Sequence, residues 1–165
     1  MGNDGRYSSW QLIILFGLRI LLGWHMLYEG VAKLLNPAWS SAEYLLESKW
    51  IFSGLFHWIV MHKEVLNTVD FINTWGLIAI GLGLIMGLLT KTAAISGAFL
   101  LGLYYLAVPP LTGLTYSIPF EGNYLVVNKT LIEVFALLVL AVFPIGTLSL
   151  DAYITRLKSC KHREN

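Results

Sequence analysis

The stretch LRILLGWHMLYEGVAKLL (residues 18–35) decides the fold, because this apolar run also contains an arginine, a histidine, a glutamate and a lysine. It belongs to a longer apolar run, residues 10–35. About 20 apolar residues are enough for a helix to cross the ~30 Å hydrocarbon core of a bilayer. Residues four apart share a helix face, so His25, Glu29 and Lys33 form one polar stripe. We therefore expect a membrane-spanning helix with a polar face that needs partners.

The composition of the chain is that of a membrane protein. Of its 165 residues, 56% are apolar and 13% are charged, whereas about 25% of the residues in soluble domains are charged. The apolar runs at residues 10–35, 69–89, 93–111 and 124–146 are long enough for four spans. We expect an all-α fold, a four-transmembrane-helix bundle that forms one domain over residues 1–165.

Several classes of function are disfavoured by the sequence. The net charge of +1, with no basic patch before the tail, argues against nucleic-acid binding. The single cysteine, Cys160, excludes an internal disulfide or a C-x-x-C pair. The histidines other than His25, at positions 57, 62 and 162, fall outside the predicted spans, which argues against haem. Neither zinc-ligand spacing nor any sign of a flavin or another metal is present.

The connection between the first two spans is expected to be helical in part. Ser40, with Glu43 three residues later, has the pattern of a capping box that begins a short helix. The stretch WIFSGLFHWIVM (residues 50–61) is too short to span a bilayer and too apolar for water, so we expect an interfacial or partly re-entrant helix. It would serve as a membrane-surface anchor, with a lid as the alternative. SLDAYITRLKSCK (residues 149–161) predicts an amphipathic C-terminal helix on the inner surface.

The distribution of basic residues predicts the orientation. Arg6, Lys91 and the basic tail would lie on one side, and the lysines of the other side lie among acidic residues. The positive-inside rule then places both termini in the cytoplasm, which corresponds to the inner membrane of a bacterium. Gly83 and Gly87 have the small-xxx-small spacing of close helix contacts, so a homodimer through this face is one option.

The fourth span repeats the polar pattern of the first. Lys129 and Glu133 lie one turn apart, and an antiparallel arrangement places Lys129 level with Lys33 near the outer interface. Glu29 and Glu133 would then both lie about 6 Å deeper. Because an unpaired charge in the bilayer core costs about 2.5 to 3.5 kcal/mol on insertion scales, we interpret these charges as one network. The simpler alternative is that the lysines extend to the headgroups and each glutamate pairs locally.

Polar residues of the other spans enter at a similar depth, so all four spans can contribute to one outward-facing pocket. We predict that its proton carriers are His25, Glu29 and Glu133. Arg19 lies about 15 Å deeper than Glu29, and it either reaches the inner headgroups or meets the bundle, a partner subunit or a ligand. The predicted substrate-binding or quinone-binding residues are Lys33, Lys129, Arg19, Asp70, Asn73, Tyr104 and Asn128.

These stretches resemble the DoxX-like membrane proteins, which include the DoxD-type subunit of thiosulfate:quinone oxidoreductase. Residues 18–35 resemble the family's opening helix at Arg19, Gly23, Gly30, Lys33 and Leu34. MGLLTKTAA (residues 86–94) resembles its turn between helices two and three, and PIGTLSLDAYI (residues 144–154) its closing Gly-x-x-Ser-x-Asp pattern. GNYLVVNKTLIE (residues 122–133) is similar to the DoxD-type and related bacterial members. The resemblance implies a four-helix membrane bundle associated with redox or sulfur metabolism and with quinone.

Two classes of function follow from this interpretation. The first is a redox subunit that binds quinone or a small anion and takes part in thiosulfate or other sulfur-compound oxidation. The thiosulfate enzyme also uses a small second subunit, which is not fused to this chain. The second is a scaffold or assembly partner of an oxidoreductase complex without catalytic activity of its own. A small-molecule transporter is disfavoured, because four helices leave a monomer little room for alternating access.

Overall fold

The computed structural model describes residues 7–111, 113–114, 116–117 and 125–143. These residues form helices and contain no strand, so the expected all-α class is confirmed. Two of the helices, α1 and α4, are long and apolar enough to cross a membrane. In chain order the helices are α1 (Ser9–Leu34), α2 (Ala42–Leu46), α3 (Ser53–Met61), α4 (Lys63–Met86), α5 (Thr90–Ala107) and α6 (Lys129–Val142).

The long helices differ from the expected spans mainly at their ends. α4 begins at Lys63, six residues before the apolar run, because Lys63, Glu64, Asn67 and Thr68 interrupt the apolar pattern in its first turns. α5 ends at Ala107 rather than at residue 111, since Pro109 and Pro110 follow and proline cannot continue a helix. α6 begins after Asn128, whose side chain accepts a hydrogen bond from the Leu131 amide. Residues 125–128 of the predicted fourth span are not helical, and residues 124 and 144–146 lie outside the described residues.

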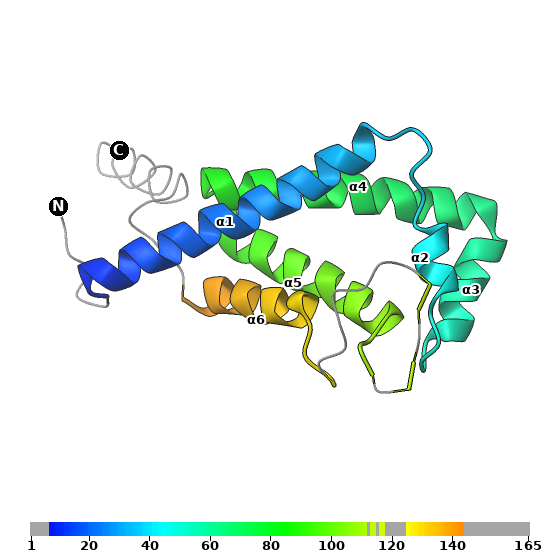
Figure 1. Cartoon of the computed structure of the whole chain (residues 1–165). Helices are drawn as coiled ribbons and strands as arrows, with labels where there is room; N and C mark the ends of the chain where they lie inside the picture. The colour runs from blue at the N-terminus through cyan, green and yellow to red at the C-terminus, as the bar shows by residue number, and fades with distance from the viewer. Residues whose placement is uncertain (1–6, 112, 115, 118–124, 144–165) are drawn as a thin grey trace, which may run out of the picture.

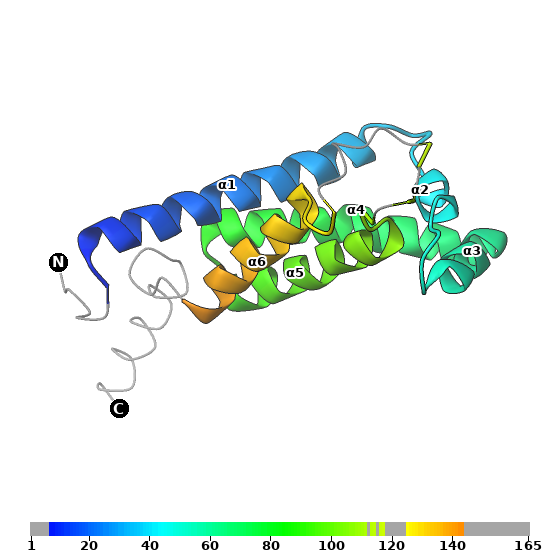
Figure 2. The same ribbon diagram turned by 60° about the horizontal axis from the view of Figure 1, so that its bottom comes forward.

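The four long helices pack side by side with alternating direction (Figure 1). α1 packs along α4, α4 packs on α5, and α5 packs on α6, while α6 meets α1 through a less extensive contact. Figure 2 shows that α2 and α3 lie together at one end of this bundle, where α1 ends and α4 begins. We call this end the α2–α3 end. The buried side chains of the main core come from all four long helices: Leu22, Met26, Leu77, Ile80, Leu84, Ala94, Ala98, Leu101, Leu137, Leu140 and Ala141.

Glycines allow the closest helix contact in the bundle, between α1 and α4. A Cβ atom on Gly81 would lie 2.5 Å from the Leu27 backbone nitrogen and 2.7 Å from the Gly23 carbonyl oxygen. Gly30 is similarly close to the Ile78 backbone. The expected pair Gly83 and Gly87 has a different role, because Gly87 ends α4 in the left-handed conformation with φ of 68°. A homodimer through that face stays a prediction.

The outer surfaces of the long helices carry many large apolar side chains. Large exposed apolar surfaces in proteins mark contacts with lipid or with other proteins. The most exposed side chains on α1, α4, α5 and α6 include Trp10, Ile14, Leu21, Trp24, Phe71, Ile72, Phe99, Ile132, Phe135 and Val142.

The connection between α1 and α4 contains two helices, α2 and α3, as the sequence predicts. The apolar stretch 50–61 forms α3, which buries Phe56 and exposes Leu55, Trp58 and Met61. The predicted capping box at Ser40 is wrong, because α2 begins at Ala42 and its N-cap residue makes no side-chain capping bond. The interfacial position of α3 stays a prediction. The amphipathic C-terminal helix and the closing Gly-x-x-Ser-x-Asp pattern fall on residues outside the described part of the chain.

The close contact of α1 with α4 predicts opposite effects for two glycine substitutions in α4. Gly81→Ala should lower the free energy of unfolding by about 1 to 3 kcal/mol, because its Cβ would overlap backbone atoms of α1. Gly76→Ala is the matched control, since no atom lies within 4 Å of a Cβ at that position. It should raise the same free energy by about 0.5 to 1 kcal/mol, since alanine is the better helix former.

Unfolding of both variants in detergent, followed by circular dichroism, measures the difference. Equal stability of Gly81→Ala and Gly76→Ala would contradict the close contact.

Candidate functional site

Lys33 is the centre of a polar cluster at the α2–α3 end. Its Nζ donates hydrogen bonds to the Tyr104 hydroxyl at 2.9 Å and to Asn73 Oδ1 at 3.4 Å. The Tyr104 hydroxyl in turn donates to Asn73 Oδ1 at 2.5 Å. Lys33 also lies 5.0 Å from the centre of the Trp39 ring and 5.1 Å from that of Tyr104, within the range of cation–π attraction. One ammonium group therefore connects α1, α4 and α5 with the loop after α1.

The charge of Lys33 has neutral groups as its nearest partners. Among the described residues, no carboxylate lies within ion-pair distance of its ammonium. Glu29 and Asp70 act on Lys33 electrostatically from further away. Asn73 is only 6% exposed, so the cluster is well shielded on the α4 side. Such a cation, only partly neutralised, can attract an oxyanion or a polarised carbonyl oxygen.

Asp70 anchors the start of α2 instead of pairing with Lys33. Its carboxylate accepts hydrogen bonds from the Ser40 hydroxyl at 2.8 Å, from the Ser41 amide at 3.0 Å and from the Ser41 hydroxyl. This explains why Ser40 does not form the expected capping box. The serine hydroxyls instead donate to a carboxylate two turns into the neighbouring helix α4.

Tyr44 of α2 covers the Tyr104 side of the cluster. Its hydroxyl donates to the Tyr104 carbonyl oxygen at 2.9 Å, and the two ring centres are 5.8 Å apart. Burial raises the pKa of the Tyr44 hydroxyl above its usual range. The sequence interpretation missed both Tyr44 and Trp39. The available signal was the concentration of aromatic residues in the connection between the first two spans.

A second polar contact joins α1 to α6. His25 Nε2 lies 3.4 Å from Glu133 Oε1, and the two side chains are 33% and 15% exposed. The expected depth match was wrong by one turn, because Glu133 is level with His25 and not with Glu29. Among the described residues, Glu29 makes no hydrogen bond or ion pair of its own and acts on Lys33 only at longer range.

The remaining predicted site residues lie apart from the Lys33 cluster. Lys129 is exposed at the first residue of α6, and Asn128 is used as the N-cap of that helix. Arg19 is 2% exposed and lies with its guanidinium carbon 5.0 Å from the centre of the Phe16 ring. The structure thus brings together Lys33, Asn73 and Tyr104, with Glu29 and Asp70 nearby, and separately His25 with Glu133.

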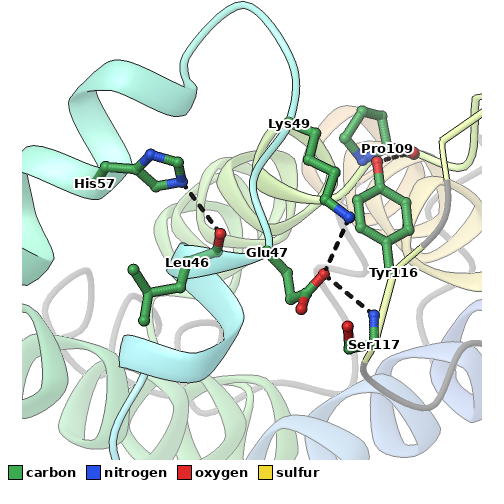
Figure 3. A network of polar contacts seen from close by, with 7 residues as sticks. All are labelled: Leu46, Glu47, Lys49, His57, Pro109, Tyr116 and Ser117. Atoms are coloured by element: carbon green, nitrogen blue, oxygen red, sulfur yellow. Dashed lines mark hydrogen bonds and ion pairs between the residues drawn. The ribbon is translucent and has the colours of Figure 1, made fainter.

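A network on the outside of the α2–α3 end fastens α2 to the segment after α5 (Figure 3). Glu47 Oε2 accepts a hydrogen bond from the Ser117 amide at 3.1 Å and lies 3.5 Å from Lys49 Nζ. Lys49 also lies 5.5 Å from the centre of the Tyr116 ring, and the Tyr116 hydroxyl donates to the Pro109 carbonyl at 2.7 Å. The hydrogen bond from Ser117, helped by the charge of Lys49, lowers the pKa of Glu47 below its usual value.

The ring nitrogens of two histidines in the α3 region also contact backbone carbonyl oxygens. His57 Nε2 lies 3.1 Å from the Leu46 carbonyl oxygen and so links α3 to α2. His62 Nδ1 lies 2.8 Å from the Trp58 carbonyl oxygen within the same segment. Within the part of the chain that the structure describes, no group of three His, Cys, Asp or Glu residues is arranged to hold a metal ion.

Comparisons with known proteins return no match: no family model, no curated protein and no solved structure is similar to this chain. The resemblance to DoxX-like proteins therefore stays a prediction from the quoted stretches.

The lowered pKa of Glu47 predicts that the contact with Ser117 depends on pH. A carboxyl group whose pKa is lowered by folding stabilises the folded contact above its unfolded pKa and loses that contribution as the pH falls through its folded pKa. Protection of the Ser117 amide from hydrogen exchange should therefore be present at neutral pH. It should decrease below the usual range of a glutamate pKa, after correction for the intrinsic exchange rate.

Glu47→Gln should remove this pH dependence. Glu43→Gln, at an exposed carboxylate of the same helix, should leave it unchanged. Protection of Ser117 that is independent of pH in the unsubstituted protein would contradict the assignment.

Proposed function

We propose that this chain is an integral membrane protein of the DoxX-like kind, with α1, α4, α5 and α6 as four membrane-spanning helices. The stretches that resemble the family support this proposal, together with the apolar side chains exposed on all four helices. The α2–α3 end would face outward and both termini the cytoplasm, in agreement with the positive-inside rule. The corresponding location is the cytoplasmic membrane of a bacterium.

The proposed function is that of a redox-associated subunit which binds a small sulfur oxyanion or a quinone headgroup at the Lys33 cluster. The observation that carries this proposal is the Lys33 ammonium, whose close partners are the neutral groups of Tyr104 and Asn73. A helix pair that needed only cohesion would be expected to neutralise such a charge with a carboxylate at contact distance. The remaining N–H of Lys33 and the Asn73 amide group, which makes no hydrogen bond to a described residue, are donors for a ligand oxygen.

The electron balance of such a reaction involves the two substrates alone. Two thiosulfate ions that join through a new sulfur–sulfur bond release two electrons. A quinone that accepts these two electrons also takes up two protons and becomes a quinol. Glu29 lies one turn from Lys33 and is the carboxylate closest along α1 to the proposed site, so we assign it the role of proton carrier. A small second subunit would be the partner that supplies or orients the sulfur substrate.

Quinone reduction by the purified protein in lipid tests this proposal. The absorbance of a short-chain quinone is followed with thiosulfate and with other small sulfur donors. The unsubstituted protein should show a donor-dependent rate, and Lys33→Met should lower that rate at least tenfold by removing the cation. Glu29→Gln should lower it as well, with a loss that is greater at higher pH, where protons are scarcer. Lys63→Met is the matched control, because Lys63 is exposed at the start of α4.

The alternative of a scaffold without catalytic activity predicts a different result. No rate with any donor, and no quinone carried through purification, would overturn the redox proposal. In that case the Lys33 cluster orders the bundle and the chemistry belongs to a partner.

A further inference from the structure

The contact between α1 and α6 is the least extensive among the neighbouring long helices, and a polar pair bridges it. We call this contact the α1–α6 seam and define it by His25 and Glu133. Figure 2 shows both α1 and α6. His25 lies eight residues before Lys33 on α1, which corresponds to about 12 Å along the helix axis. The seam is therefore separate from the Lys33 cluster.

The seam opens onto an apolar surface. One third of the His25 side chain is exposed. Leu21, Trp24 and Tyr28 are strongly exposed on α1 close to His25, and Ile132 and Phe135 are exposed next to Glu133 on α6. A titratable pair at the edge of such a surface faces the hydrocarbon interior of a bilayer rather than water, provided that the chain spans the membrane as proposed.

One nitrogen of His25 is available to a ligand at this position. Nε2 faces Glu133, whereas Nδ1 makes no hydrogen bond to any described residue. A polar group without a partner in hydrocarbon is costly, so it is expected to meet one. Water and ions are scarce at that depth. The fitting partner is a lipid-soluble molecule whose polar head is attached to an apolar body.

The two protonation states of His25 fit two forms of the same ligand. When neutral His25 donates Nε2–H to Glu133, Nδ1 is an acceptor suited to the hydroxyl of a quinol. When the imidazole is protonated, Nδ1–H is a donor suited to the carbonyl of a quinone. Glu133 faces Nε2 and so orients the ring, which makes it a positioning residue.

We propose that the α1–α6 seam is the binding site for the quinone headgroup, with His25 Nδ1 as its hydrogen-bond partner and the apolar tail along the exposed side chains of α1 and α6. This inference rests on the proposed function, since it needs both the membrane placement and the use of quinone. It assigns the two ligands to two places, so the two electrons released by the sulfur oxyanions cross the ~12 Å between the Lys33 cluster and the seam, and the two protons join the quinone at the seam. The lipid-soluble acceptor enters from the bilayer at the seam, and the water-soluble sulfur oxyanion binds at the Lys33 cluster.

Binding of decylubiquinone to the full chain in lipid nanodiscs tests this inference. His25→Phe keeps an aromatic ring but removes both nitrogens, and it should weaken binding about tenfold, the effect of one lost hydrogen bond. His57→Phe is the matched control, because His57 lies in α3 away from the seam, and it should bind as the unsubstituted protein does. The infrared carbonyl band of the bound quinone should shift to lower frequency in the unsubstituted protein and return toward its free position in His25→Phe.

His25→Gln is the control for a folding defect. Its amide can replace the hydrogen-bond donor, so it should restore part of the affinity and of the infrared shift. Unchanged affinity and an unchanged carbonyl band in His25→Phe would overturn the inference. If Lys33→Met alone abolishes quinone binding, the quinone belongs at the Lys33 cluster, so this inference fails while the proposed function stands. If the unsubstituted protein binds no quinone, the inference and the quinone part of the proposed function fail together.

Discussion

The ammonium of Lys33 is held where three long helices meet, and the arrangement of the α2–α3 end depends on this contact. Tyr104 of α5 accepts one of its hydrogen bonds, and Asn73 of α4 accepts from both Lys33 and Tyr104. Tyr44 of α2 then packs on Tyr104 and donates to its backbone. A single side chain thus relates the helix pair α1 and α4 to α5 and to the covering segment α2.

The closeness of the helix contacts differs between the two polar sites. Gly23, Gly30 and Gly81 bring α1 so close to α4 that their backbones are in contact. α6 packs mainly against α5 and meets α1 less extensively. As a result Lys33 lies at a well-packed junction, whereas His25 and Glu133 lie at an open seam. The cation of Lys33 is the basis for our assignment of an anionic, water-soluble ligand to the first site, and the exposed apolar side chains are the basis for a lipid-soluble ligand at the second.

The sequence predicts the helical class and part of the site for an identifiable reason. Lys33 and Tyr104 lie near the ends of α1 and α5, and Asn73 lies near the start of the predicted second span, so their common depth follows from the order of the spans. The depth of Glu133 does not follow in this way. Antiparallel helices can shift by one turn with the same apolar pattern, and the structure has Glu133 level with His25 rather than with Glu29.

At several positions a contact with a distant residue determines the structure, and the local sequence pattern predicts something else. The pattern of Ser40 and Glu43 is that of a helix cap, but Asp70, thirty residues later, accepts a hydrogen bond from the Ser40 hydroxyl. Trp39 and Tyr44 enter the site only because the connection folds back over the bundle. Gly83 and Gly87 have the spacing of a helix contact, yet Gly87 is needed to end α4. Each case requires knowledge of a distant neighbour that spacing along the chain does not contain.

A double-mutant cycle between Lys33→Met and Tyr104→Phe tests the central claim most directly. The free energy of unfolding in detergent is measured for the unsubstituted protein, both single variants and the double variant. The direct hydrogen bond between these side chains predicts a coupling energy of about 0.5 to 3 kcal/mol. Effects that simply add, with no coupling, would contradict a junction of α1 and α5 through Lys33.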